Sequence, residues 1–295
     1  MPRIARAARP PTPEAAMLHF AYDGTINGDW ASHYAVRLAQ HDVEQRLRLI
    51  HVDEGKISPE SLEERLHLLG DRCRMAGVTL EQTILPRGRT VFEAIAAAVP
   101  PGPESFVVCG TRAQQRGRGY LTGTVTERLL VQRRWNVLAL RVVRPGVLGH
   151  PRRLLLPVAG LPEGLALGLP FLKMLLPDLT DLFVLRVMEV GRFRYRRLTH
   201  ARREALLEPG RAYLRRIEAE LAERLDLGQV RMEGQPIVSD DVPKEIAIAA
   251  SRVHSDLIYL GASRRNLTER FFYGNPIEQT LRSAPCDVAV YGGPA

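Results

Sequence analysis

Short apolar runs alternate along this chain with longer stretches in which apolar residues recur every third or fourth position. A short apolar run is typical of a buried strand, and the three-to-four spacing is typical of an amphipathic helix. In the first half this pattern predicts strands near 17–22, 46–53, 78–85, 104–110 and 136–143, and helices near 29–41, 59–76, 88–99 and 124–133. Apolar strands that alternate with helices are typical of an α/β fold, a parallel sheet covered on both faces.

The second half of the chain repeats the first. In both, an apolar strand ends in glycine (Gly110, Gly261), and a second glycine follows thirteen residues later (Gly123, Gly274) before a short helical pattern and another strand. Other segments align as pairs: 88–99 with 239–250, 18–25 with 154–161, and 47–52 with 181–187. A repeat of this length indicates two copies of one folding unit. We therefore predict a flexible basic tail (1–16), a first domain (17–145), a linker (146–151) and a second domain (152–295).

Composition and charge change this picture little. The chain has 295 residues, enough for two domains, and a formal net charge of +8 that comes almost entirely from arginine. Its apolar stretches are too short for a membrane span, and the basic start has no apolar middle region of the signal-peptide kind. We expect a cytoplasmic protein with no membrane partner. The positive charges are spread over many segments, so a nucleic-acid partner is not favoured.

One segment, 191–204, does interleave arginines with aromatic residues, as nucleic-acid binders do. Its position after the second predicted strand of the second copy favours a solvated, mobile insert instead.

Candidate catalytic and metal-binding residues are sparse. The cysteines Cys73, Cys109 and Cys286 are scattered, none forms a Cys-x-x-Cys pair, and no histidine cluster has metal-ligand spacing. Cys109 ends an apolar run and is expected to be a buried apolar side chain. No Ser-His-Asp set is recognisable. We therefore predict no metal site and no catalytic machinery.

The segment GTRAQQRGRGYLTGT, residues 110–124, carries the clearest candidate chemistry. Gly110 allows a sharp turn off a strand, and Gly123 precedes a predicted helix whose first N–H groups and partial positive charge attract anions. With the Thr124 hydroxyl, these residues form a candidate phosphate cradle. A ligand-free alternative is equally concrete: Thr124 caps the helix, and Glu127 reaches back to the Thr124 N–H in a capping box. The loop arginines Arg112, Arg116 and Arg118 could neutralise phosphates, although solvation is the simpler interpretation. Gly117 and Gly119 are expected to provide only flexibility.

Taken together, these motifs resemble the universal stress proteins in their tandem, two-domain form. The nucleotide-binding branch of that family carries Gly-x-x-Gly, nine residues, then Gly-Ser/Thr. Here Gly110, Ala113, Gly123 and Thr124 have that spacing, with alanine in place of the second glycine. The start AYDGTINGDWASHYAVRLA, in which Asp23 closes a strand, and the later LIHV also resemble the family's first two strands.

The resemblance implies two Rossmann-like, adenine-nucleotide α-hydrolase-like domains, each a five-stranded parallel sheet, packed as an intramolecular pseudo-dimer through their last strands. It implies a stress-response or regulatory protein that binds ATP in the first domain, with Mg²⁺ or Mn²⁺ on the phosphates and at most slow ATP hydrolysis. Two chains are expected to assemble further. The implied nucleotide-binding residues are Ala21, Tyr22, Asp23, Val52, Gly110, Ala113, Gly123, Thr124 and Val125.

The second copy departs from the motif, since Ala159, Arg264, Asn275 and Pro276 replace Asp23, Ala113, Thr124 and Val125. Proline has no N–H to offer a phosphate, so we expect no nucleotide there. The main alternative is a nucleotide-free scaffold that works through protein partners. An enzyme that activates a substrate with ATP is a weaker alternative, because AYDGTING lacks the Ser-Gly-Gly type of motif such enzymes carry after the first strand.

Overall fold

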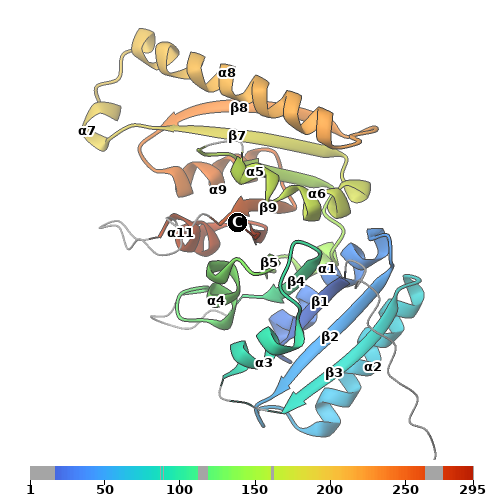
Figure 1. The fold of residues 1–295 in the computed structure, drawn as a ribbon. Coiled ribbons are helices and arrows are strands. Elements are labelled where there is room, and N and C mark those ends of the chain that lie inside the picture. The colour runs from blue at the N-terminus through green and yellow to red at the C-terminus, as the bar shows by residue number, and fades with distance from the viewer. Residues whose placement is uncertain are drawn as a thin grey trace, which may run out of the picture.

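Ten strands form one continuous sheet in the computed structural model, which describes residues 17–86, 88, 90–111, 119–160, 163–262 and 275–294 (Figure 1). The strand order is β3-β2-β1-β4-β5-β10-β9-β6-β7-β8. Each half of the chain contributes five strands in the same relative order, and the strands within each half are parallel. The predicted α/β fold class, two parallel five-stranded units joined as a pseudo-dimer, is confirmed.

The elements of the first half follow the predicted pattern closely. They are β1 (Met17–Tyr22), α1 (Ile26–His41), β2 (Arg46–Asp53), α2 (Pro59–Met75), β3 (Thr79–Pro86), α3 (Val91–Ala98), β4 (Ser105–Gly110), α4 (Val125–Gln132) and β5 (Asn136–Arg141). Helix α1 begins earlier than expected because Thr25 caps it: its Oγ1 accepts the Gly28 N–H at 3.1 Å.

The second half varies the same plan. After the short η1 (Pro145–Val147) come β6 (Arg153–Pro157), α5 (Glu163–Ala166), α6 (Leu169–Leu175), η2 (Leu176–Asp178), β7 (Asp181–Glu189), α7 (Arg192–Tyr195), α8 (His200–Arg224), β8 (Arg231–Ser239), α9 (Val242–Arg252), β9 (Leu257–Gly261), α11 (Pro276–Ser283) and β10 (Asp287–Gly292).

The segment 191–204 contains α7 and the start of α8, which Thr199 caps by accepting the Arg202 N–H. Phe193 in α7 is exposed, in keeping with the solvated part of the prediction.

The two halves join through β5 and β10, which pair antiparallel over five residues from Val137–Gly292 to Arg141–Val288. The last strand of each half was expected to be an apolar sheet edge, and each edge is covered by the other. The prediction that these strands pair within one chain is confirmed.

Buried polar contacts reinforce this junction. Asp287, at the start of β10, is fully buried and accepts the Tyr34 hydroxyl at 2.8 Å and the N–H groups of Val143 and Arg144 at 2.7 and 2.8 Å. Burial raises the pKa of this carboxyl, and the three hydrogen bonds oppose the shift. Arg37 of α1 also binds Asp178 of the second half with two nitrogens. Both contacts bring α1 against the second half.

Two core layers enclose the sheet. One lies between the sheet and α1, α2, α6 and α8, and the other between the sheet and α3, α4, α9 and α11. Alternation along a strand therefore decides which layer a side chain enters. Cys109 is buried in the second layer, as predicted, and burial raises its pKa to about 12. In the part of the chain described above, no helix combines the length and apolar character needed to cross a bilayer.

His19 of β1 makes folding sensitive to acid. Its ring is buried, Nδ1 has no hydrogen-bond partner among the described residues, and burial, aided by the charge of Arg48, lowers its pKa to about 4. Between about pH 6.5, the ordinary value, and pH 4, the unfolded chain binds a proton that the folded chain excludes, so stability falls as the pH falls.

We expect His19→Leu to gain about 2 kcal/mol relative to the parent chain when the pH drops from 7 to 5, because it removes this proton uptake. Denaturant unfolding of both proteins at the two pH values measures the difference. His200→Leu, at an exposed position, should show no such change. A difference for His19→Leu that does not vary with pH would contradict the assignment.

Candidate functional site

The predicted nucleotide-binding residues that the structure describes lie near the ends of β1, β2 and β4 and at the start of α4, where the strand order reverses. β1 and β4 are neighbours, yet the chain continues from β1 outward to β2 and from β4 outward to β5. In parallel sheets ligands bind beyond the carboxyl ends of the strands at such a switch point. The Thr126 hydroxyl donates to the Gly110 carbonyl at 3.0 Å and so holds the start of α4 at the end of β4.

The ends of β1 and β2 supply the side of the site expected to hold adenine. Ala21 and Val52 both pack against the core layer that contains α4, so they share the face of the sheet on which α4 begins. Asp23 is exposed just past β1, and its Oδ1 accepts the N–H of Thr25 at 3.0 Å and its hydroxyl at 2.8 Å. Ala21 and Asp23 thus lie at the end of β1, and Val52 lies near the end of the neighbouring β2.

Tyr22 differs from its neighbours. Its ring is buried in the opposite core layer, and its hydroxyl donates to Asp29 Oδ1 at 2.5 Å. Burial, with the Asp29 carboxylate, raises its pKa. Only the backbone of Tyr22 faces the strand ends, where its carbonyl lies 2.9 Å from His51 Nδ1. The period-2 alternation of a strand explains this, since adjacent residues cannot line one face with both side chains.

Gly110 is required by a close side-chain contact. A Cβ there would lie 2.8 Å from Nδ2 of Asn27. That buried amide donates to the Thr111 carbonyl at 2.9 Å and accepts the Val142 N–H at 3.3 Å, so it bridges the ends of β4 and β5. The glycine at position 110 is therefore needed for packing against Asn27, in addition to any role in binding a ligand.

The start of α4 is a capping arrangement with one change from the expected box. Thr124 Oγ1 accepts the Glu127 N–H at 3.0 Å, as predicted. However, the Glu127 carboxylate accepts the N–H of Gly123 at 2.6 Å rather than that of Thr124, whose N–H donates to the Leu121 carbonyl at 3.0 Å. The reason is the left-handed backbone of Gly123 (φ +73°), which turns its N–H toward the helix. A carboxylate thus occupies one of the donors expected to hold phosphate.

The next donors of α4 remain available. Among the residues that the structure describes, none accepts the N–H of Val125 or of Thr126, the first two residues of this helix. Unpaired N–H groups at a helix N-terminus are where anions bind. Ala113 and the arginines Arg112, Arg116 and Arg118 lie outside the described residues, as does Gly117.

The structure adds a residue that sequence reasoning missed. Glu278 of α11, in the second half, accepts the N–H groups of Tyr120, Leu121 and Thr122 in the first half at 2.7–2.8 Å. A Cβ at Gly119 would lie 2.7 Å from its Oε1, so Gly119 is needed for this approach and not merely for flexibility. The repeat could have pointed to Glu278, because it aligns with Glu127 at the offset that relates the two halves.

The second half lacks the equivalent chemistry at its described positions. Asn275 caps α11 by accepting the Ile277 N–H at 2.9 Å, and Pro276 takes the first helical position, as the sequence predicts. Ala159 provides no carboxylate. Gly274 and Arg264 lie outside the described residues.

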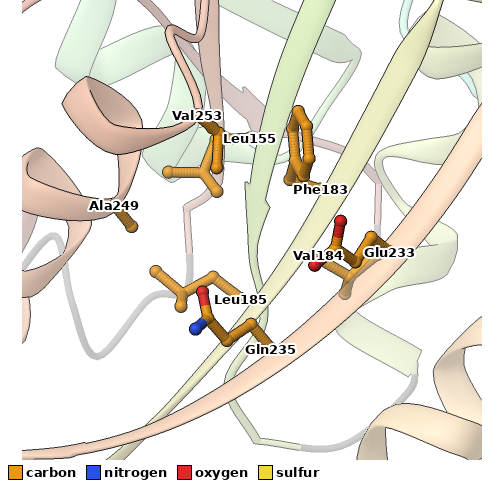
Figure 2. A pocket seen from close by; sticks show the side chains of 8 residues that line it. All are labelled: Leu155, Phe183, Val184, Leu185, Glu233, Gln235, Ala249 and Val253. Carbon is orange, nitrogen blue, oxygen red and sulfur yellow. The ribbon is translucent and has the colours of Figure 1, made fainter.

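A small pocket does lie in the second half, on the β6–β8 face beneath α9 (Figure 2). Its lining residues are Leu155, Phe183, Val184, Leu185, Glu233, Gln235, Ala249 and Val253. Only about 20 Å³ is open to the centre of a water molecule, which is far too little for a nucleotide. Within the described ranges, no group of three His, Cys, Asp or Glu side chains could hold a metal ion.

Comparison with known proteins identifies a family that the second half of the chain resembles. Residues 152–292 match the Universal stress protein family, which confirms the resemblance seen in the sequence. No curated protein sequence matches the chain.

Solved structures share the fold over nearly the whole chain. A universal stress protein from Archaeoglobus fulgidus DSM 4304 is 17% identical, with a TM-score of 0.60, over 94% of this chain and 98% of that one. A putative universal stress protein from Pseudomonas aeruginosa UCBPP-PA14 is 16% identical, with a TM-score of 0.54, over 94% and 92%. The cytoplasmic domain of a prokaryotic cation chloride cotransporter is 14% identical, with a TM-score of 0.55, over 95% and 96%. At these identities the likeness concerns the fold alone.

We expect Gly110→Ala to destabilise the chain by about 1–3 kcal/mol, because the added methyl group must displace the Asn27 amide and its hydrogen bonds. Gly70→Ala is a matched control within α2, where a Cβ would have no neighbour within 4 Å; it should stabilise by about 0.5–1 kcal/mol. Thermal and denaturant unfolding measure both. Equal effects of the two substitutions would show that Asn27 does not constrain Gly110.

Proposed function

We propose that this chain, whose second half matches the Universal stress protein family, acts in the cytoplasm as a stress-response regulatory protein that binds an adenine nucleotide, ATP, in its first half. The observation that carries the proposal is the start of α4, where the Val125 and Thr126 N–H groups have no acceptor among the described residues and lie at the strand-order switch point. A phosphate group matches both the charge and the hydrogen-bonding needs of this helix end.

The proposed roles follow the positions of the residues. Ala21, Asp23 and Val52 would contact adenine, with Tyr22 contributing only its backbone. Gly110 and Ala113 would lie beside the ribose and phosphates. The Val125 N–H would hold the phosphates, and the Thr124 hydroxyl would join it by exchanging its 2.5 Å hydrogen bond to the Leu121 carbonyl for one to a phosphate oxygen.

Mg²⁺ or Mn²⁺ would accompany the phosphates as their counter-ion, since a nucleotide can bring its own metal without a dedicated set of protein ligands. We propose no enzymatic activity beyond slow ATP hydrolysis, and we propose that two chains associate.

A nucleotide-free scaffold is the second candidate, and one observation favours it. The Gly123 N–H already donates to Glu127, so a phosphate must compete with a carboxylate of the same charge. Calorimetry with Mg²⁺-ATP, together with mass spectrometry of small molecules released from the purified protein, separates the two candidates. No binding at millimolar ATP and no released nucleotide would refute the proposed function and leave the scaffold.

We expect Val125→Pro to weaken ATP binding about tenfold, because it removes one N–H donor to a charged phosphate. Proline suits the first position of a helix, Thr124 before it is extended, and Pro276 already occupies the equivalent position in the second half. Folding should therefore be preserved, which thermal unfolding checks. An unchanged dissociation constant in calorimetry would place the phosphates elsewhere.

Glu127→Gln is expected to strengthen ATP binding several-fold. The amide keeps an oxygen to accept the Gly123 N–H but removes a negative charge from beside the phosphates. Titrations at low and high salt should show the gain shrinking as ions screen the repulsion. Weaker binding would mean that Glu127 supports the site rather than competing with it.

A further inference from the structure

The Gly-rich loop of the first half already holds an anion, and the second half supplies it. Glu278 Oε2 accepts the Tyr120 N–H at 2.8 Å, while Oε1 accepts the N–H groups of Leu121 and Thr122 at 2.7 and 2.8 Å and the Thr122 hydroxyl at 3.1 Å. The residue is only 9% exposed. Successive N–H groups that converge on one carboxylate form a backbone nest, and hydrogen bonds to a charged acceptor are the strong ones.

The loop is built around this carboxylate. Gly119 leaves room for it, since any Cβ there would lie within 3 Å of Glu278. Tyr120 and Leu121 are buried, and the Arg141 guanidinium lies over the Tyr120 ring, 4.6 Å from its centroid. The turn is therefore anchored in the core by Tyr120 and Leu121 and bound to the other half of the chain through Glu278.

The turn that Glu278 binds also positions Thr124, which caps the start of α4. The Leu121 carbonyl accepts both the N–H of Thr124, at 3.0 Å, and its hydroxyl, at 2.5 Å. The same peptide segment thus donates to Glu278 and accepts from Thr124. A continuous series of direct contacts runs from α11 of the second half to the helix end where we place the phosphates.

We infer that Glu278 is a positioning residue for the first half's nucleotide site, through which the second half sets the phosphate-binding loop. The inference rests on the proposed function for its consequence in binding, but not for the contact itself. It gives a role to a half in which, at the described helix start, Asn275 and Pro276 replace Thr124 and Val125. Glu278 lies at the helix position equivalent to Glu127, yet it binds the loop of the other half. Nucleotide binding at α4 and packing of α11 against the loop are consequently coupled.

The test is Glu278→Gln, compared with Glu127→Gln as the repeat-related control that removes the same charge from the same helix position. In Glu278→Gln, an amide NH₂ faces backbone donors, so the nest loses acceptors. Hydrogen exchange of the Tyr120, Leu121 and Thr122 amides should accelerate roughly tenfold or more, because their acceptor is lost. Binding of Mg²⁺-ATP should weaken about tenfold, whereas Glu127→Gln should strengthen it.

The outcomes separate cleanly. Unchanged exchange of these amides, or faster exchange with unchanged ATP affinity, overturns the inference. Failure of the parent chain to bind ATP refutes the proposed function and, with it, the binding role of Glu278, while the exchange measurement still decides whether Glu278 holds the loop. If Glu278→Gln does not fold, Gly119→Ala, which displaces the carboxylate with a methyl group, should produce the same two changes.

Discussion

The antiparallel pairing of β5 with β10 is the contact on which the other long-range features depend. Each strand is the apolar last strand of its half, and alone it would expose a row of unpaired backbone groups. Pairing satisfies those groups and makes one sheet of ten strands. It also brings α11 beside the loop before α4, so that Glu278 reaches Tyr120–Thr122. Without this pairing β5 and β10 would each be an exposed sheet edge, and Glu278 would not reach the loop before α4.

Backbone N–H groups, and not ion pairs alone, stabilise the buried carboxylates where the two halves meet. Asp287 and Glu278 are both buried carboxylates from the second half, and each accepts several N–H groups from the first. A buried charge is costly unless hydrogen bonds replace its hydration, and these backbone groups do so. Both carboxylates also fix local geometry, because a nest of N–H groups admits its acceptor in one direction only. These directional hydrogen bonds therefore help to fix how the two halves are aligned with each other.

The equivalent helices α4 and α11 begin differently in the two halves. At the described positions the first half keeps the glycine turn, the threonine cap and open N–H groups, which suit an anion. The second half has a proline-started helix and contributes its glutamate to the neighbour instead. The equivalent residue Glu127 stays within its own cap. The same helix position thus carries a glutamate that accepts from its own helix start in the first half and from the other half's loop in the second.

Local sequence determined most of the fold. The apolar runs, the helical spacing and the cap at Thr124 predicted nearly every element of the first half, because these signals act over a few residues. The repeat predicted the second half and the internal pairing. The sequence did not predict the short helix α7 within the segment 191–204, nor that Tyr22 faces away from Ala21 in the site.

The placement of Glu278 and of the Asn27 amide against Gly110 was decided only by the tertiary structure. These contacts join residues 83 to 158 positions apart, as Gly110 lies 83 residues from Asn27 and Tyr120 lies 158 from Glu278. No local pattern encodes such neighbours, because Asn27 meets Gly110 only where β1 pairs with β4, and Glu278 meets Tyr120 only where β5 pairs with β10.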